Sequence, residues 1–125
     1  MKITAFNPII ITKDPEPAIA LFEALGFERK HMKTGINDKD ITSVDLKHPN
    51  GFRVDVVKSD AVPQDITSIR MNVRDFDEAY EYLISKGFRN AQGDKVTDTG
   101  SSKATMMVSP SGYSINLVEH IRKDG

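Results

Sequence analysis

Apolar and polar residues alternate in short runs along this chain, and the runs recur in the same order in its second half. The β-branched run Ile9 to Ile11 predicts a strand over residues 6–12, and its counterpart is predicted over residues 66–73. Each strand leads to an aspartate, Asp14 or Asp75, that is suited to cap a helix. An aspartate side chain accepts hydrogen bonds from the free backbone N–H groups of a first helical turn, so a helix is expected after each strand.

Apolar residues at helical spacing predict these helices over residues 16–25 and 77–86. Both stop at a glycine that is followed by phenylalanine, as expected for a left-handed helix terminus. Two tight turns, Pro49-Asn50-Gly51 and Pro110-Ser111-Gly112, predict that the strands beside them pair with one another. Three strands are expected after each helix: 28–34, 41–46 and 52–57 in the first half, and 89–96, 104–108 and 113–118 in the second.

The two halves align without a gap, because Asp14 and Asp75, Gly26 and Gly87, and Gly51 and Gly112 are each separated by 61 positions. This register predicts two copies of one βαβββ unit, residues 1–58 and 66–120, joined by a linker over 59–65. At 125 residues, the copies form one domain of the α+β class.

The paired strand, Asp-capped helix, Gly-Phe and Pro-x-Gly turn resemble the vicinal oxygen chelate (VOC) superfamily, which includes glyoxalase I, bleomycin resistance proteins and extradiol dioxygenases. The resemblance covers nearly the whole chain. It implies a single glyoxalase-like domain in which two βαβββ modules curl their strands into a cup-like mixed sheet, with the helices outside and the ligand within. It also implies a homodimer, with the cup built either within one chain or by exchange of modules between two.

Metal-dependent members of the superfamily take one ligand from the first strand and one from the last strand of each module. By this resemblance the four positions are Asn7, Asp55, Ser68 and Asn116. They carry one carboxylate, two amides and a hydroxyl in place of the imidazoles and carboxylates of the family. Amides and hydroxyls are weak ligands for nickel, zinc or iron, so we expect no metal cofactor, and a divalent ion is disfavoured.

Strand alternation tests the same surface without reference to any family. The apolar faces of the strands must meet the helices, so the opposite faces are expected to line the cup. The predicted ligand-binding residues on those faces are Asn7, Arg53, Asp55, Ser68, Arg70, Asn72, Ser114 and Asn116. One of Met106 and Met107 is expected to join them. An ordinary solvated sheet surface, with Arg53 or Arg70 paired to Asp55, is the alternative.

Arg70 is the leading candidate, because a guanidinium forms a fork for a carboxylate or phosphate group. Asp45, if it turns inward, would compete as a protein partner for that arginine. The three histidines, His31, His48 and His120, fall on none of the four family positions and are interpreted as surface or rim residues. The segments 35–40 and 100–103 are expected to form hairpins at the mouth of the cup.

Composition narrows the classes of function. The chain has no cysteine, which excludes disulfides, thiolate metal sites and cysteine nucleophiles, and fits a cytoplasmic protein. The net charge is -1 with both signs interspersed, so neither nucleic acid nor a membrane surface is expected as a partner.

Three functions remain open. The first is metal-free binding and sequestration of a small molecule, possibly anionic. The second is a metal-dependent glyoxalase-like lyase or dioxygenase. The third is a cofactor-free enzyme acting on an anionic substrate, with Asp55 or His31 as the base and Arg70 as the clamp.

Overall fold

The computed structural model describes residues 1–33 and 43–120. It divides into two compact units, Asn7–Ser68 and Met1–Phe6 joined with Ile69–Gly125. We call them the amino-terminal unit and the carboxy-terminal unit. The first six residues therefore belong with the second half of the chain.

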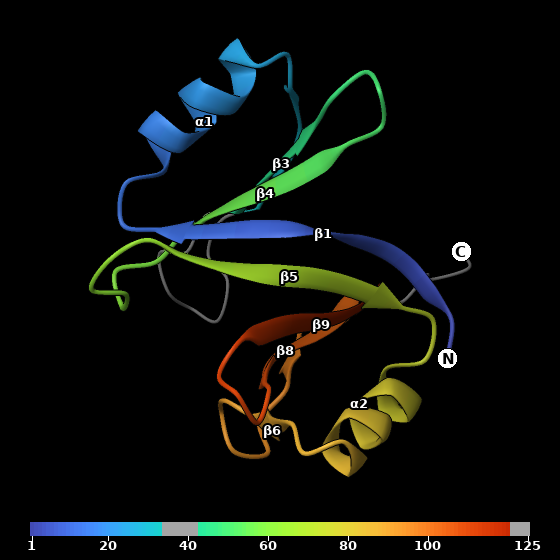
Figure 1. Ribbon diagram of the computed structural model, residues 1–125. Coiled ribbons are helices and arrows are strands. Elements are labelled where there is room, and N and C mark those ends of the chain that lie inside the picture. The colour runs from blue at the N-terminus through green and yellow to red at the C-terminus, as the bar shows by residue number, and fades with distance from the viewer. Residues whose placement is uncertain (34–42, 121–125) are drawn as a thin grey trace. The chain divides into compact units, whose positions relative to one another are not determined.

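The amino-terminal unit carries one helix, the second to fourth strands and residues 7–12 of the first strand (Figure 1). Antiparallel pairing joins β2 to β3 and β3 to β4, and parallel pairing joins β4 to β1. The elements are β1 (Ile3–Thr12), α1 (Pro15–Ala24), β2 (Glu28–Lys33), β3 (Ser43–Lys47) and β4 (Arg53–Lys58).

The carboxy-terminal unit repeats this plan, with β5 parallel to β9 and β9 antiparallel to β8. The short strands β6 and β7 both pair with β8. The elements are β5 (Ile66–Val73), α2 (Phe76–Ser85), β6 (Arg89–Asn90), β7 (Thr97–Asp98), β8 (Ser102–Val108) and β9 (Ser114–His120). The predicted α+β class is confirmed, and the described part of the second half differs from the predicted βαβββ order by one additional short strand, β7.

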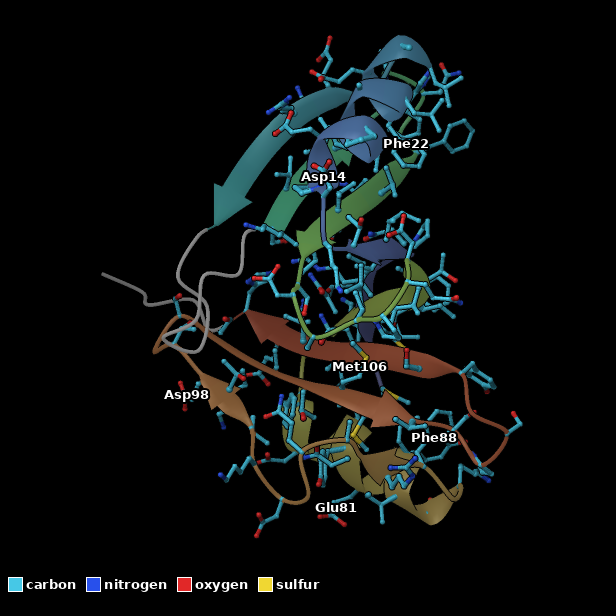
Figure 2. The ribbon with its side chains drawn as sticks, turned by 90° about the vertical axis from the view of Figure 1, so that its left-hand side faces the viewer. Asp14, Phe22, Glu81, Phe88, Asp98 and Met106 are labelled. Atoms are coloured by element: carbon cyan, nitrogen blue, oxygen red, sulfur yellow. The ribbon has the colours of Figure 1, made fainter. Side chains whose placement is uncertain are left out.

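Both predicted helix caps are present. The side chain of Asp14 accepts from the backbone N–H of Glu16 at 3.4 Å, and that of Asp75 accepts from Glu78 at 3.1 Å. Figure 2 shows Asp14 at the start of α1 and Phe22 further along the same helix. Each aspartate accepts a hydrogen bond from a backbone N–H that has no partner within the helix, and this cap fixes the residue at which the helix begins.

Each helix covers the apolar face of its own sheet. In the amino-terminal unit, Ile19 of α1 packs against buried residues of β3 and β4, namely Val44, Leu46, Val54 and Val56. In the carboxy-terminal unit, Ala79 and Leu83 of α2 pack with Met71, Val73, Phe76, Met107 and Leu117. Because neighbouring strand residues alternate between faces, the residues between these core positions lie on the side away from the helices.

An ion pair on the exposed surface links α1 to the strand after it. Arg29 of β2 contacts Glu23 at 3.2 Å. The hydrogen bonds that the guanidinium of Arg29 donates to the Glu23 carboxylate raise the pKa of Arg29 above its usual value. Both side chains are exposed to solvent, so this contact contributes little to stability.

The predicted strand over residues 89–96 is wrong for most of its length, since β6 ends at Asn90. The side chain of Asn90 explains the break. Its amide nitrogen donates to the carbonyl of Lys95 at 2.9 Å, and its oxygen accepts from the N–H of Gln92 at 2.9 Å and the hydroxyl of Thr105 at 2.7 Å. A buried asparagine that binds its own following loop competes with sheet pairing.

Two aromatic residues that directly precede the strands β4 and β9 are exposed. Phe52 is 64% exposed and Tyr113 is 56% exposed. Both precede their strands, β4 and β9, by one residue, so the helices do not cover them. In the described ranges, no helix is long and apolar enough to cross a membrane.

Candidate functional site

The polar face of the amino-terminal unit is centred on Asp55 of β4. Its neighbours in the strand, Val54 and Val56, belong to the core under α1, so Asp55 lies on the other face. In the sheet register, Asp55 is directly opposite Ile9 of β1 on one side and Asp45 of β3 on the other. Two carboxylates are thus cross-strand neighbours.

Both carboxylates are buried, with Asp45 8% exposed and Asp55 2% exposed. Arg53 Nη1 lies 3.1 Å from Asp45 Oδ2, so Arg53 pairs with Asp45. The other oxygen, Asp45 Oδ1, has no hydrogen-bond partner among the residues that the structure describes. Sequence reasoning considered Asp45 only as a partner for Arg70, although the tight turn at Pro49 to Gly51 was a signal that could have placed it opposite Asp55.

Asn7 of β1 lies on the same polar face as Asp55. It is 5% exposed, and its amide nitrogen donates to the carbonyl of Pro8 at 3.0 Å. By strand alternation it shares a face with Ile9, which pairs with Asp55. The structure therefore brings three predicted residues, Asn7, Arg53 and Asp55, onto one face together with Asp45.

The polar face of the carboxy-terminal unit is formed by alternate residues of β5 and β9. Arg70 is the register partner of Asn116, and Met106 of β8 is opposite Asn116 on its other side. Met107 has no exposed surface and belongs to the core, so Met106 is the methionine on the polar face. By the same alternation, the predicted residues Asn72 and Ser114 also lie on this face.

Asn72 and His120 are among the residues that contact the guanidinium of Arg70. Its Nε donates to Asn72 Oδ1 at 3.0 Å, and its Nη2 contacts His120 Nε2 at 3.1 Å. A guanidinium can only donate, so His120 Nε2 is the acceptor in this contact. Asn72 is 8% exposed, which makes it a rigid support. Sequence reasoning placed His120 at the rim past the last strand, whereas it is the last residue of β9.

The structure also places two of the three histidines and one of the two segments that were predicted to form hairpins. The backbone of His31 pairs with Asp45 across β2 and β3. His48 accepts from the N–H of Asn50 at 3.0 Å, so it supports its own turn as a rim residue. The predicted hairpin 35–40 lies outside the described residues. In the segment 100–103, Ser102 begins β8, and its hydroxyl lies 3.0 Å from that of Thr99.

The four family positions do not fit a transition-metal ion. Asn7, Asp55 and Ser68 belong to the amino-terminal unit and Asn116 to the carboxy-terminal unit. Their donor atoms are one carboxylate, two amides and one hydroxyl, and nickel, zinc and iron favour imidazole and stronger anionic donors. Throughout residues 1–33 and 43–120, no cluster of three or more His, Asp or Glu residues is arranged to hold a metal.

A cavity of about 560 Å³ lies beside α1 in the amino-terminal unit. Its lining includes Ile10, Pro17 and Phe22. Ile10 and Phe22 also pack against the core under the helix, so this cavity is on the helix side of the sheet. It is separate from the face that carries Asp45 and Asp55.

Comparison with solved structures identifies the fold. Methylmalonyl-CoA epimerase from Mycobacterium tuberculosis superposes with a TM-score of 0.74 at 19% identity, over 96% of this chain and 90% of that chain. A glyoxalase/bleomycin resistance protein/dioxygenase superfamily member from Vibrio splendidus 12B01 gives a TM-score of 0.62 at 18% identity, over 94% and 99% of the two chains.

A glyoxalase I mutant from Zea mays gives a TM-score of 0.68 at 12% identity, over 97% of this chain and 44% of that chain. This chain therefore spans less than half of the maize chain. No family model matches the sequence, and no curated protein matches it either. The likeness in structure over nearly the whole chain shows that this protein has the fold of the vicinal oxygen chelate superfamily.

Proposed function

We propose that this protein binds and sequesters a small anionic molecule, and that Arg70 on the polar face of the carboxy-terminal unit recognises its carboxylate or phosphate group. The observation that carries the proposal is the hydrogen bond from Arg70 Nε to Asn72, at 3.0 Å. It anchors a half-buried guanidinium to a buried amide. An arginine fixed in this way loses little conformational entropy when it binds an anion, which favours tight binding.

The surroundings of Arg70 suit a small organic ligand. Asn116, its register partner, offers an amide, and Met106 beside Asn116 adds an apolar, adaptable side chain. A surface that combines apolar contact with a few polar groups is typical of small-molecule sites. Methylmalonyl-CoA epimerase, one of the similar structures, is named for a substrate that carries a carboxylate. This supports an anionic ligand here.

We further propose that binding needs no metal ion at the four family positions, since their donor atoms do not suit the metals of the family. The experiment is a thermal-shift screen of carboxylates, phosphate esters and acyl-CoA thioesters in the presence of a chelator. Isothermal titration calorimetry of the ligands that stabilise the protein would follow. Loss of all binding in the chelator would contradict the metal-free part of the proposal.

Two charge-matched variants test the role of Arg70. Hydrogen bonds to charged groups contribute about 1.5–3 kcal/mol, so Arg70→Gln is expected to weaken binding by about 10-fold to 150-fold. Arg89→Gln removes an exposed arginine from the same unit and is expected to leave the affinity unchanged. The proposal fails if no anionic ligand binds, or if both variants weaken binding equally.

Sequestration and catalysis are separated by recovering the ligand. After prolonged incubation with the protein, mass spectrometry is expected to return the bound molecule unchanged. Conversion to a product would instead favour the cofactor-free enzyme, with Asp55 as the base to test first. A homodimer is part of the proposal, because the superfamily often assembles in this way, and sedimentation velocity at micromolar concentration is the measurement that checks it.

A further inference from the structure

The cavity of about 560 Å³ beside α1 has no role in the function proposed above. All of its lining residues belong to the amino-terminal unit. Its apolar lining includes Ile10 of β1 together with Ala18 and Phe22 of α1. Its charged lining residues are Lys13, Asp14 and Asp65. Apolar walls with a few charged groups, in a cavity of about 300–1,000 Å³, are typical of binding sites.

The apolar residues of this cavity are less covered than their counterparts in the carboxy-terminal unit. Three of them are half-buried at the edge of the core: Ile10, Ala18 and Phe22. The residues 61 positions further along are 5%, 0% and 7% exposed, and they are Met71, Ala79 and Leu83. The sheet register confirms this equivalence, because Ile10 pairs with Val56 and Met71 pairs with Leu117, which is 61 positions after Val56. Some part of the chain therefore covers this side of α2 but not of α1.

The amino-terminal segment of the chain provides that cover. The α-amino group of Met1 lies 3.2 Å from Glu78 Oε1 in α2. The carbonyl of Lys2 accepts from the backbone N–H of Arg74 at 3.0 Å. Residues 1–6 belong to the carboxy-terminal unit, and Figure 1 shows the amino terminus beside α2. An extended segment thus lies along this side of α2.

No such segment is held beside α1. The residue that corresponds to Arg74 is Lys13, and the residue that corresponds to Glu78 is Pro17. Across residues 1–33 and 43–120, the N–H of Lys13 has no backbone partner. The cavity beside α1 therefore has the apolar walls and the backbone donor of a groove that is filled by an extended chain in the other unit.

We propose that the cavity beside α1 binds an extended, positively charged peptide segment of a partner protein, in the manner in which residues 1–3 lie beside α2. A carbonyl of the segment accepts from the N–H of Lys13, as the carbonyl of Lys2 accepts from Arg74. An apolar side chain of the segment covers the half-buried residues Ile10, Ala18 and Phe22. Backbone hydrogen bonds then supply affinity, and the apolar contact supplies specificity.

The charges of the cavity favour a basic segment. Asp14 and Asp65 contribute two negative charges and Lys13 one positive charge, so the lining has a net charge of -1. The segment beside α2 carries two positive charges, on the α-amino group of Met1 and on Lys2. Asp14 Oδ1 already caps α1, so we assign Asp65 as the partner of the positive group. Opposite charges of this kind steer association and fix the register of a bound segment.

The test uses the full chain and a synthetic peptide with the sequence of residues 1–6, which has a free amino group and carries fluorescein at its carboxyl end. Fluorescence anisotropy is expected to show saturable binding to the parent protein. Acetylation of the peptide's amino group removes one positive charge. It is expected to weaken binding by about 1.5-fold to 5-fold, which is the usual effect of one exposed ion pair.

Two matched pairs of variants locate the bound peptide. Leu21 lines the cavity and Leu25 does not, although their exposures are 56% and 57%. Leu21→Lys removes apolar contact and adds a repelling charge, so it is expected to weaken binding by about 10-fold or more, whereas Leu25→Lys should leave binding unchanged. Asp65→Asn is expected to weaken binding by about 1.5-fold to 5-fold. Asp60→Asn removes an exposed carboxylate outside the cavity and should have no effect.

Amide NMR of the isotope-labelled protein tests the backbone contact directly. The N–H resonance of Lys13 is expected to move to lower field and to exchange more slowly with solvent when the peptide binds, because this group gains an acceptor. The N–H of Arg74 is already bonded to Lys2 and should change little. The reverse pattern would mean that the peptide displaces the protein's own amino terminus from α2, and it would overturn the proposal.

Three other results would contradict the proposal. They are the absence of saturable binding, equal losses in Leu21→Lys and Leu25→Lys, and a dimer that dissociates on Leu21→Lys in sedimentation velocity. In the last case a second copy of the chain covers the cavity. Arg70→Gln is expected to leave peptide binding unchanged, so this test is independent of the anion-binding proposal.

Discussion

Gly87, at the end of α2, is the position where one added methyl group should be most informative. Its φ is +93°, in the region that glycine adopts more readily than other residues. A Cβ atom at this position would lie 2.9 Å from Cγ of Pro110. Carbon atoms in favourable contact are about 3.5–4.0 Å apart, so the alanine side chain would overlap the proline ring. The overlap involves a rigid ring, which cannot swing aside.

Two costs add in Gly87→Ala. A left-handed backbone costs about 1–2 kcal/mol for a residue with a Cβ atom, and overpacking costs typically about 1–3 kcal/mol. The expected loss in the free energy of unfolding is therefore about 2–5 kcal/mol. Gly112→Ala separates the two costs. Its φ is +110° and no atom lies within 4 Å of the added Cβ, so only the backbone cost of about 1–2 kcal/mol applies.

Urea denaturation followed by circular dichroism measures both losses, with equal m-values as the check that the comparison is valid. We expect Gly87→Ala to lose at least about 1 kcal/mol more than Gly112→Ala. If the two variants lose the same free energy, the contact with Pro110 is not a constraint. The inference that Pro110 of the Pro-x-Gly turn restricts Gly87 of the Gly-Phe pair would then be wrong.

Two further substitutions test the described packing. Met107→Ala should lower the free energy of unfolding by about 2–5 kcal/mol, because Met107 lies in the core with no exposed surface. Met106→Ala, on the opposite face of β8, should lower it far less. Similar losses in the two variants would contradict the assigned faces of β8. Thr105→Val should cost about 1–2 kcal/mol, because it removes the buried 2.7 Å hydrogen bond to Asn90. Thr67→Val on an exposed position is its control, with an expected change within about 0.5 kcal/mol.

Local chemistry was sufficient to predict most of the elements. The caps at Asp14 and Asp75 begin their helices as predicted, and both helices end within a residue or two before their glycines. Alternation within β4 correctly separated Val54 and Val56 from Asp55. These features depend on interactions between groups a few residues apart, so they can be predicted from the local sequence.

The sequence pattern predicted the wrong strand length, or missed a contact, where the deciding side chain is distant in the chain. The hydroxyl of Thr105 and the loop after Asn90 together end β6 after two residues. Nothing in the run over residues 89–96 reveals that Asn90 will be buried. The contact between Arg70 and His120 likewise joins residues 50 positions apart in the chain.

The sequence by itself determined the repeat, the order of elements and the face on which each polar residue lies, because these follow from spacing along one strand or helix. Only the tertiary structure decided which polar residues meet. The register of β3 against β4 placed Asp45 opposite Asp55, and Arg53 bound Asp45. Register depends on turn geometry and on the packing of Val44 and Val56 beneath α1. A pair of buried carboxylates is therefore a property of the folded sheet that no single strand reveals.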